Sequence, residues 1–218
     1  MKNILIPICL VGQASYIYFN TKKKNNIALL SKTIASICFV CFAYFNSAIS
    51  FNQFNVLIII GMILDAIGDI FLGLRNLVAE KKMFYIGALS FMIGHVFYIF
   101  TLMPFVKPLI IYALIASIVL DYFVVRFIKS LCTITKTQNV IAYIYLFLIF
   151  TILTFSVCAY INNTNSMYLL FMIGSLLYAC SDVLLIIYNY AIKNKWLHPL
   201  YSCLYYVGQL LIAFSLML

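Results

Sequence analysis

Long apolar segments, separated by short polar breaks, run along the entire chain. Eight of them can be delimited, at about residues 3–19, 27–46, 53–74, 84–103, 107–125, 139–160, 166–188 and 198–218. The prediction of helices rests on their continuous apolar character and not on a repeat of about 3.6 residues. Since roughly 20 apolar residues span the hydrocarbon core of a bilayer, the pattern predicts an all-α, polytopic membrane bundle of about eight transmembrane helices.

The composition agrees with this prediction and excludes the other large classes of protein. Hydrophobic residues make up 66% of the 218 residues and charged residues only 9%, against about 25% charged residues in soluble domains. Eight spans use nearly the whole chain, so we expect residues 1–218 to form a single integral membrane domain. The first segment begins like a short signal peptide, but its apolar run continues through Phe19 and predicts an uncleaved span.

Basic residues are concentrated in alternate connections between the predicted helices. Twelve of the 14 lysines and arginines lie in or beside the first, third, fifth and seventh connections, whereas Lys2 and Lys107 lie elsewhere. Because cytoplasmic loops carry an excess of Lys and Arg, we predict that these connections face the cytoplasm and that both termini lie outside. We interpret the net charge of +9 as this orientation signal, and not as a surface for nucleic acid. The membrane would be the inner membrane in a bacterium and the endoplasmic reticulum in a eukaryote.

An internal similarity relates the two halves of the chain. Residues 60–72 align with residues 173–185 at an offset of 113 residues, and the pair Gly94-His95 matches Gly208-Gln209 more faintly. The offset corresponds to four predicted helices, and an even number of spans gives a parallel repeat about an axis along the membrane normal. We therefore predict a four-plus-four arrangement with the working site where the halves meet.

Three charged residues are predicted to lie at one depth inside the membrane. Lys32, Asp69 and Asp182 each lie five or six residues from the cytoplasmic end of a predicted helix, which corresponds to about 8–9 Å. Ionisable groups in hydrocarbon are costly, so each needs a partner or a function. One interpretation is that Lys32 merely neutralises one aspartate and holds helices together; the other is that the three residues line a functional pocket.

Further polar residues are predicted to lie deeper. Asp65 lies one turn below Asp69 on the same helix face, and His95 and Gln209 fall near the middle of the membrane, about 16 Å deep. We predict a polar pocket that opens to the cytoplasm and has His95 and Gln209 as its floor. Asp121, near the end of the predicted helix 107–125, is interpreted as a solvated charge.

Several short motifs occur in an order and spacing that resemble a known family. These are Gly68-Asp69-Ile70-Phe71-Leu72, the segment 84–88 leading to His95-Val96-Phe97-Tyr98, the pair Ser181-Asp182, and Tyr205-Tyr206-Val207-Gly208-Gln209. Together they resemble the YhhN-like lysoplasmalogenase family of eight-helix membrane proteins over essentially the full length. Two positions depart from the family pattern: Thr33 follows Lys32 where proline is common, and Asp65 stands where a small polar residue is usual.

The resemblance implies an enzyme that hydrolyses the vinyl ether bond of lysoplasmalogens, releasing a fatty aldehyde and a glycerophospho-base (ethanolamine or choline). Family members carry this activity on two intramembrane aspartates, which correspond here to Asp69 and Asp182. We expect no metal and no other cofactor; the expected partners are the lysophospholipid substrate and membrane lipids, with the oligomeric state left open. The expected substrate-binding or supporting residues are Lys32, Asp65, Tyr85, His95, Tyr98 and Gln209.

The types of residue present suit this chemistry independently of the resemblance. A vinyl ether is hydrolysed when an acid protonates its alkene carbon remote from the oxygen, which leaves an oxocarbenium ion that water captures. Burial favours a carboxylic acid that keeps its proton, and a second, ionised carboxylate stabilises the cation, as in glycosidases. The sequence does not assign these two roles. A basic rim would attract the substrate phosphate; its candidates are Arg75, Lys81, Lys82, Lys193 and Lys195.

Two other functions use similar residues. A proton-coupled transporter of small molecules also has intramembrane carboxylates and repeated halves, and a structural or lipid-sensing bundle needs no turnover at all. A hydrolase needs a pocket that opens on one side, whereas a transporter needs access from both sides.

Overall fold

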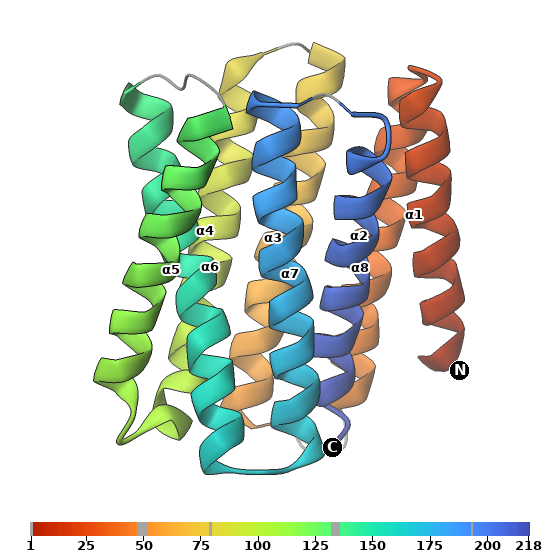
Figure 1. Ribbon diagram of the computed structural model, residues 1–218. Coiled ribbons are helices and arrows are strands. Elements are labelled where there is room, and N and C mark those ends of the chain that lie inside the picture. Colours follow the sequence, from red (N-terminus) through yellow and green to blue (C-terminus); the bar gives the residue numbers. More distant parts are fainter. Residues whose placement is uncertain (1, 48–51, 79, 132–135, 193) are drawn as a thin grey trace.

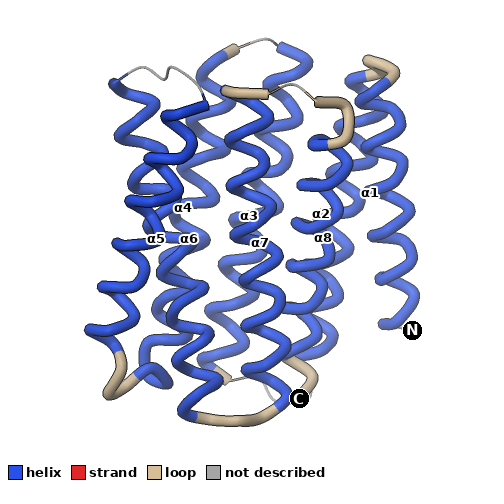
Figure 2. The backbone as a smooth tube through the Cα atoms, in the orientation of Figure 1, coloured by secondary structure: helices blue, strands red, loops and turns tan. Residues whose placement is uncertain are grey.

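The structure, a computed structural model, describes residues 2–47, 52–78, 80–131, 136–192 and 194–218. Within them, each of the eight predicted segments forms an α-helix, and the helices are joined by short connections (Figures 1 and 2). A short 3-10 turn at Lys2–Ile4 precedes the first helix. The helices are α1 (Leu5–Thr21), α2 (Asn25–Ser47), α3 (Gln53–Val78), α4 (Lys81–Val106), α5 (Ile110–Leu131), α6 (Lys136–Asn162), α7 (Ser166–Tyr190) and α8 (Leu197–Ser215).

The fold is that of an integral, multi-pass membrane protein. By length and composition, six helices in the described part of the chain, α2 to α7, are able to cross a membrane. Helix α1 has only 17 residues, and α8 carries several buried polar side chains. Both nevertheless run along the axis of the bundle beside the other six (Figure 1), as the prediction of about eight transmembrane helices requires.

Six of the helices form a closed ring, and the other two lie outside it. In the ring, α2 packs on α3, α3 on α4, α4 on α6, α6 on α7, α7 on α8, and α8 on α2. Helix α1 packs outside on α2 and α8, and α5 packs outside on α6 and α7. The run α2–α3–α4 therefore corresponds to α6–α7–α8, which is the packing expected for the predicted four-plus-four parallel repeat.

Glycines bring the repeated helix pairs into close backbone contact. A Cβ atom placed on either Gly174 or Gly208 would lie 2.8 Å from the carbonyl oxygen of the other, so α7 and α8 approach closely where neither has a side chain. The equivalent contact joins α3 to α4, where a Cβ atom on Gly94 would lie 3.0 Å from the Gly61 carbonyl oxygen. These glycines account for the part of the repeat that is visible in the sequence.

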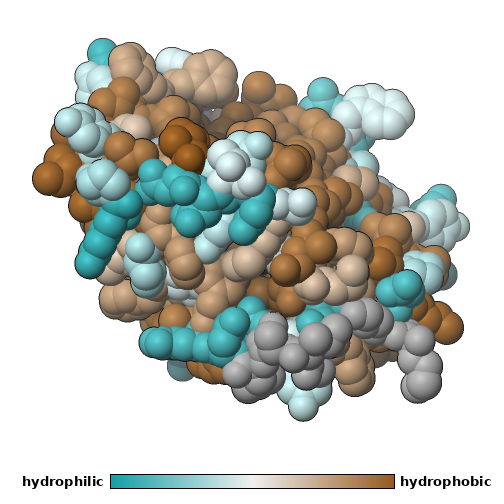
Figure 3. Space-filling view, turned by 90° about the horizontal axis from the view of Figure 1, so that it is seen from below, coloured by the Kyte–Doolittle hydropathy of each residue, from teal (hydrophilic) through white to brown (hydrophobic). Residues whose placement is uncertain are grey.

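The two ends of the bundle differ in charge. Both termini lie at one end, the lower end in Figure 1. Viewed from that end, the surface is largely hydrophobic, with hydrophilic side chains in separate patches (Figure 3). The helix ends richest in lysine and arginine lie at the opposite end, called here the basic end. That the basic end faces the cytoplasm stays a prediction.

Helices α3 and α5 extend further than the sequence indicated, and one interpretation is wrong as a result. Helix α3 continues to Val78, so Asp69 lies nine residues from its end, about 14 Å deep. Helix α5 continues to Leu131, so Asp121 lies in mid-helix, is only 8% exposed and is not a solvated charge. Arg126 and Lys129 lie on the exposed face of the helix, where a charged side chain is compatible with continued helix.

Substitution of Gly208 by alanine tests the close contact between α7 and α8. In Gly208→Ala the added methyl group meets backbone atoms that cannot rotate away, so we expect the free energy of unfolding to fall by about 1–3 kcal/mol. The control is Gly73→Ala, whose Cβ would meet the end of the flexible Leu29 side chain and should change stability little. Thermal denaturation in one detergent compares the two variants, and equal stability would contradict the packing described here.

Candidate functional site

A cavity of about 340 Å³ lies between the helices near the basic end of the bundle. Every described α-helix except α5 contributes to its walls, always with residues from the half nearest the basic end. Asp69 and Asp182 both line this cavity, as do Lys32, Tyr145 and Arg75. Two carboxyl groups from different halves of the repeat therefore face one space.

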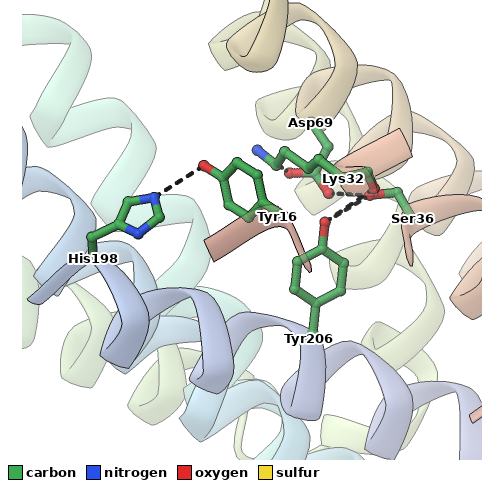
Figure 4. Close-up of polar contacts among 6 residues, drawn as sticks. All are labelled: Tyr16, Lys32, Ser36, Asp69, His198 and Tyr206. Atoms are coloured by element: carbon green, nitrogen blue, oxygen red, sulfur yellow. Dashed lines mark hydrogen bonds and ion pairs between the residues drawn. The ribbon is translucent and has the colours of Figure 1, made fainter. Parts of the chain in front are cut away.

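Asp69 is held by a lysine and a serine from the neighbouring helix α2. Lys32 Nζ lies 2.8 Å from Asp69 Oδ1, and Ser36 Oγ donates a hydrogen bond of 2.6 Å to Asp69 Oδ2. Tyr206 Oη lies 3.1 Å from Ser36 Oγ, so α8 also supports the group (Figure 4). Because Lys32 and Asp69 are both nearly buried, each charge needs the other.

Asp182 has a different partner at the equivalent place. The hydroxyl of Tyr145, on α6, donates a hydrogen bond of 2.8 Å to Asp182 Oδ2. Tyr145 follows Lys32 by 113 residues, as Asp182 follows Asp69, so each half of the repeat places a donor beside its aspartate. One donor is a cation and the other a neutral phenol. In the described part of the chain, the Lys32–Asp69 pair is the one ion pair between a basic side chain and an acidic one.

A second polar cluster lies deeper, in the centre of the ring. Asp65 Oδ2 accepts hydrogen bonds from Tyr98 Oη (2.8 Å) and Gln209 Nε2 (2.7 Å), and His95 Nε2 lies 3.2 Å from Tyr178 Oη. The contact of Gln209 with Asp65 joins α8 to α3 and that of His95 with Tyr178 joins α4 to α7, so these two cross between the halves. They are also related by the repeat, since Asp65 aligns with Tyr178 and His95 with Gln209.

The residues that were predicted to form the floor of the pocket, His95 and Gln209, lie deeper in the bundle than the cavity. His95 and Gln209 are fully buried and do not line the cavity, and neither do Asp65 and Tyr98. Aromatic rings fill the intervening space: Tyr205 lines the cavity with its ring centroid 5.4 Å from that of Tyr178. The ring of Tyr145 lies 5.2 Å from that of His95. The deep cluster thus supports the cavity from below and has no direct access to it.

The predicted rim is smaller than expected. Of its candidates, only Arg75 lines the cavity, with its guanidinium carbon 5.0 Å from the centre of the Phe84 ring. Lys81, Lys82 and Lys195 are exposed away from the cavity wall, and Lys193 lies outside the described residues. Tyr85, predicted to support the site, lines a neighbouring apolar pocket instead.

Several polar residues of α8 that the sequence analysis did not assign to the site line the cavity. His198, Ser202 and Tyr205 line the cavity, and Nδ1 of His198, Oγ of Ser202 and Oη of Tyr205 are buried with no hydrogen-bond partner among the described residues. His198 Nε2 lies 3.3 Å from Tyr16 Oη, which points toward it from α1 (Figure 4). Unpartnered buried donors and acceptors are uncommon and fit a wall that receives a polar ligand.

The arrangement is one of carboxyl, hydroxyl and cationic groups without a cluster typical of a metal site. Within the described ranges, no three His, Cys, Asp or Glu side chains come close enough together to hold a metal ion. The chemistry available to these residues themselves is proton transfer by the two carboxyl groups and electrostatic binding of an anion by Arg75 and Lys32.

Comparison with known protein families identifies a family that covers most of the chain. The profile of the YhhN family matches residues 27–216, which cover the helices of the ring except for the first two residues of α2. No curated protein and no solved structure matches the chain significantly. The family resemblance predicted from the sequence motifs is thus confirmed.

The contribution of the buried Lys32–Asp69 pair to the free energy of unfolding can be tested by substitution. Lys32→Met leaves the Asp69 carboxyl without its cation, so we expect the free energy of unfolding to fall by about 3–5 kcal/mol. The double variant Lys32→Met/Asp69→Asn removes both charges and should regain most of this loss, whereas Lys82→Met at an exposed position should have no effect. Chemical denaturation in detergent measures all three; a double variant no more stable than Lys32→Met would contradict the pairing.

Proposed function

The chain belongs to the YhhN family, and we propose that it hydrolyses the vinyl ether bond of lysoplasmalogens to a fatty aldehyde and a glycerophospho-base. Membership of the family supports a hydrolase. The observation that carries the specific reaction is that Asp69 and Asp182 line the same cavity and have different partners. Two carboxyl groups in unlike surroundings are able to divide the roles of acid and base.

In this proposal Asp182 is the general acid. An acid that protonates carbon must be a neutral carboxyl group, and burying a charge without a partner is costly. Asp182 meets the phenol of Tyr145 and no cation among the described residues. It would deliver its proton to the alkene carbon remote from the ether oxygen, and the alkene electrons would form the new C–H bond, leaving an oxocarbenium ion.

Asp69 is then the carboxylate that stabilises this cation, because Lys32 and Ser36 favour its ionised form. A water molecule attacks the oxocarbenium carbon, and its proton passes through Asp69 to restore the acid on Asp182. The resulting hemiacetal loses the glycerol oxygen as an alcohol when its own hydroxyl becomes the aldehyde carbonyl. The sum of these steps is the addition of one water molecule.

We assign the substrate phosphate to the neighbourhood of Arg75, which lines the cavity nearer the basic end than the aspartates do. Arginine binds phosphate through two parallel hydrogen bonds. The excess of basic residues at this end supports a cytoplasmic opening, in the bacterial inner membrane or, in a eukaryote, the endoplasmic reticulum. The walls come from one end of the bundle only, which favours a hydrolase over the alternative, a proton-coupled transporter with access from both sides.

Replacement of either aspartate tests the reaction. Purified protein should release aldehyde from lysoplasmenylethanolamine, and Asp182→Asn and Asp69→Asn should each lower the rate by about 10²–10⁴-fold. The matched control is Asp121→Asn, which removes a buried carboxyl on α5 that does not line the cavity and should retain full activity.

Folding is controlled separately, since Asp69→Asn leaves Lys32 unpaired. The double variant Lys32→Met/Asp69→Asn should elute as a folded protein and stay inactive. Full activity in Asp182→Asn would overturn the mechanism, and intact substrate together with solute uptake into vesicles would favour the transporter.

The phosphate assignment predicts a change in KM. Arg75→Gln removes the charged donor, and because hydrogen bonds to charged groups contribute about 1.5–3 kcal/mol, KM for the lysolipid should rise about tenfold or more with little change in kcat. The control is Lys195→Gln, which alters an exposed base outside the cavity wall. Steady-state kinetics measure both; an unchanged KM in Arg75→Gln would refute this assignment.

A further inference from the structure

An apolar pocket adjoins the cavity that contains the aspartates. It has a volume of about 70 Å³ and lies between α4 and α6, with α3 and α7 behind it. Ala88 of α4 and Ala142 of α6 face it with small side chains, and Tyr85 stands at its outer side with 43% of its surface exposed. Its lining is almost wholly hydrocarbon and aromatic, in contrast to the polar cavity.

The two spaces share a wall. Six residues line both of them, and they come from the same four helices, α3, α4, α6 and α7: Leu72, Phe84, Phe91, Tyr145, Leu185 and Asn189. Tyr145 is the residue whose hydroxyl meets Asp182, so the apolar pocket begins directly beside one of the two carboxyl groups. Leu89 of α4 and Ile144 of α6, on the two helices that border the pocket, are exposed hydrophobic residues.

We propose that the seam between α4 and α6 is the passage through which the hydrocarbon chain of a single-chain lipid leaves the cavity and enters the bilayer. This inference rests on the proposed function and adds the path of the tail to it. With the phosphate near Arg75 and the vinyl ether between the aspartates, the rest of the chain needs an apolar route.

A route into the bilayer is also favoured by energy. A buried methylene group gains about 0.8 kcal/mol over its exposure to water, but lipid tails and protein side chains are comparably apolar. A tail that continues from the pocket into lipid therefore keeps this gain without a long internal tunnel. Only the first carbons after the vinyl ether need to be held by the protein.

A second apolar space in the described structure serves as a contrast. A larger groove lies between α5, α6 and α7, and Ala116 and Thr154 are among its lining residues. It shares no lining residue with the cavity of the aspartates. An ordinary lipid molecule is able to fill it, but a tail in that groove would not reach the catalytic residues.

Narrowing the passage tests the proposal. In Ala142→Leu the added side chain fills the pocket, so kcat/KM for a lysoplasmalogen with a 16-carbon alkenyl chain should fall about tenfold relative to one with a 4-carbon chain. Ala116→Leu makes the same change in the contrasting groove and should leave the ratio as in the wild type. An unchanged ratio in Ala142→Leu would overturn the proposal.

A binding experiment separates this proposal from the proposed function. Wild-type protein in nanodiscs is irradiated with a lysophosphatidylethanolamine that carries a diazirine in the middle of its chain, with and without an excess of unlabelled lysophosphatidylethanolamine. Competed crosslinks within residues 84–89 and 140–145 support the passage, even for a protein that releases no aldehyde from any chain length. Competed crosslinks confined to the groove of α5, α6 and α7, or labelling spread over all lipid-facing helices, would overturn the passage.

Discussion

A charged side chain inside a membrane protein is stable only when another group meets it, and the Lys32–Asp69 pair is the point where this constraint acts. The pair fixes α2 against α3, and Ser36 and Tyr206 bring α8 to the same place. Since α8 also packs on α7, the position of Asp182 relative to Asp69 depends on the same contacts. The ring of helices encloses Lys32, Asp69 and Asp182, which are too polar to face lipid and are costly to bury without a partner.

The two halves of the bundle share one plan and differ in chemistry. Equivalent positions supply the two aspartates, their donors Lys32 and Tyr145, and the glycines that bring neighbouring helices together. The repeat alone would give two identical carboxyl groups with no division of labour. The exchange of a lysine for a tyrosine breaks this equivalence, and in our proposal it separates the carboxylate from the acid. The deep cluster around Asp65 uses equivalent positions of the two halves, occupied by unlike residues, and joins the halves beneath the site.

Much of this architecture could be predicted from the sequence, because a helix that crosses a bilayer must be long and apolar and its charged residues need partners. Hydropathy predicted the helices, and depth along them grouped Lys32, Asp69 and Asp182. The floor was misplaced because the spacing of residues gives their depth but not the volume of side chains between them, and the rings of Tyr145 and Tyr205 occupy the space that was assigned to the pocket. The sequence offers one signal for Tyr145: it follows Lys32 by 113 residues, the same offset that relates Asp182 to Asp69. This offset points to a contact of Tyr145 with Asp182 only after the structure shows that Lys32 contacts Asp69.

The central claim is that the reacting bond of a lysolipid lies between the carboxyl groups of Asp69 and Asp182. An experimental structure of the protein with a saturated alkyl ether lysolipid tests it most directly, because an ether without the alkene cannot be protonated at carbon and stays intact. We expect the first two chain carbons within contact distance of both carboxyl groups, with the phosphate at Arg75. A lipid bound with its ether oxygen outside this cavity would contradict the account.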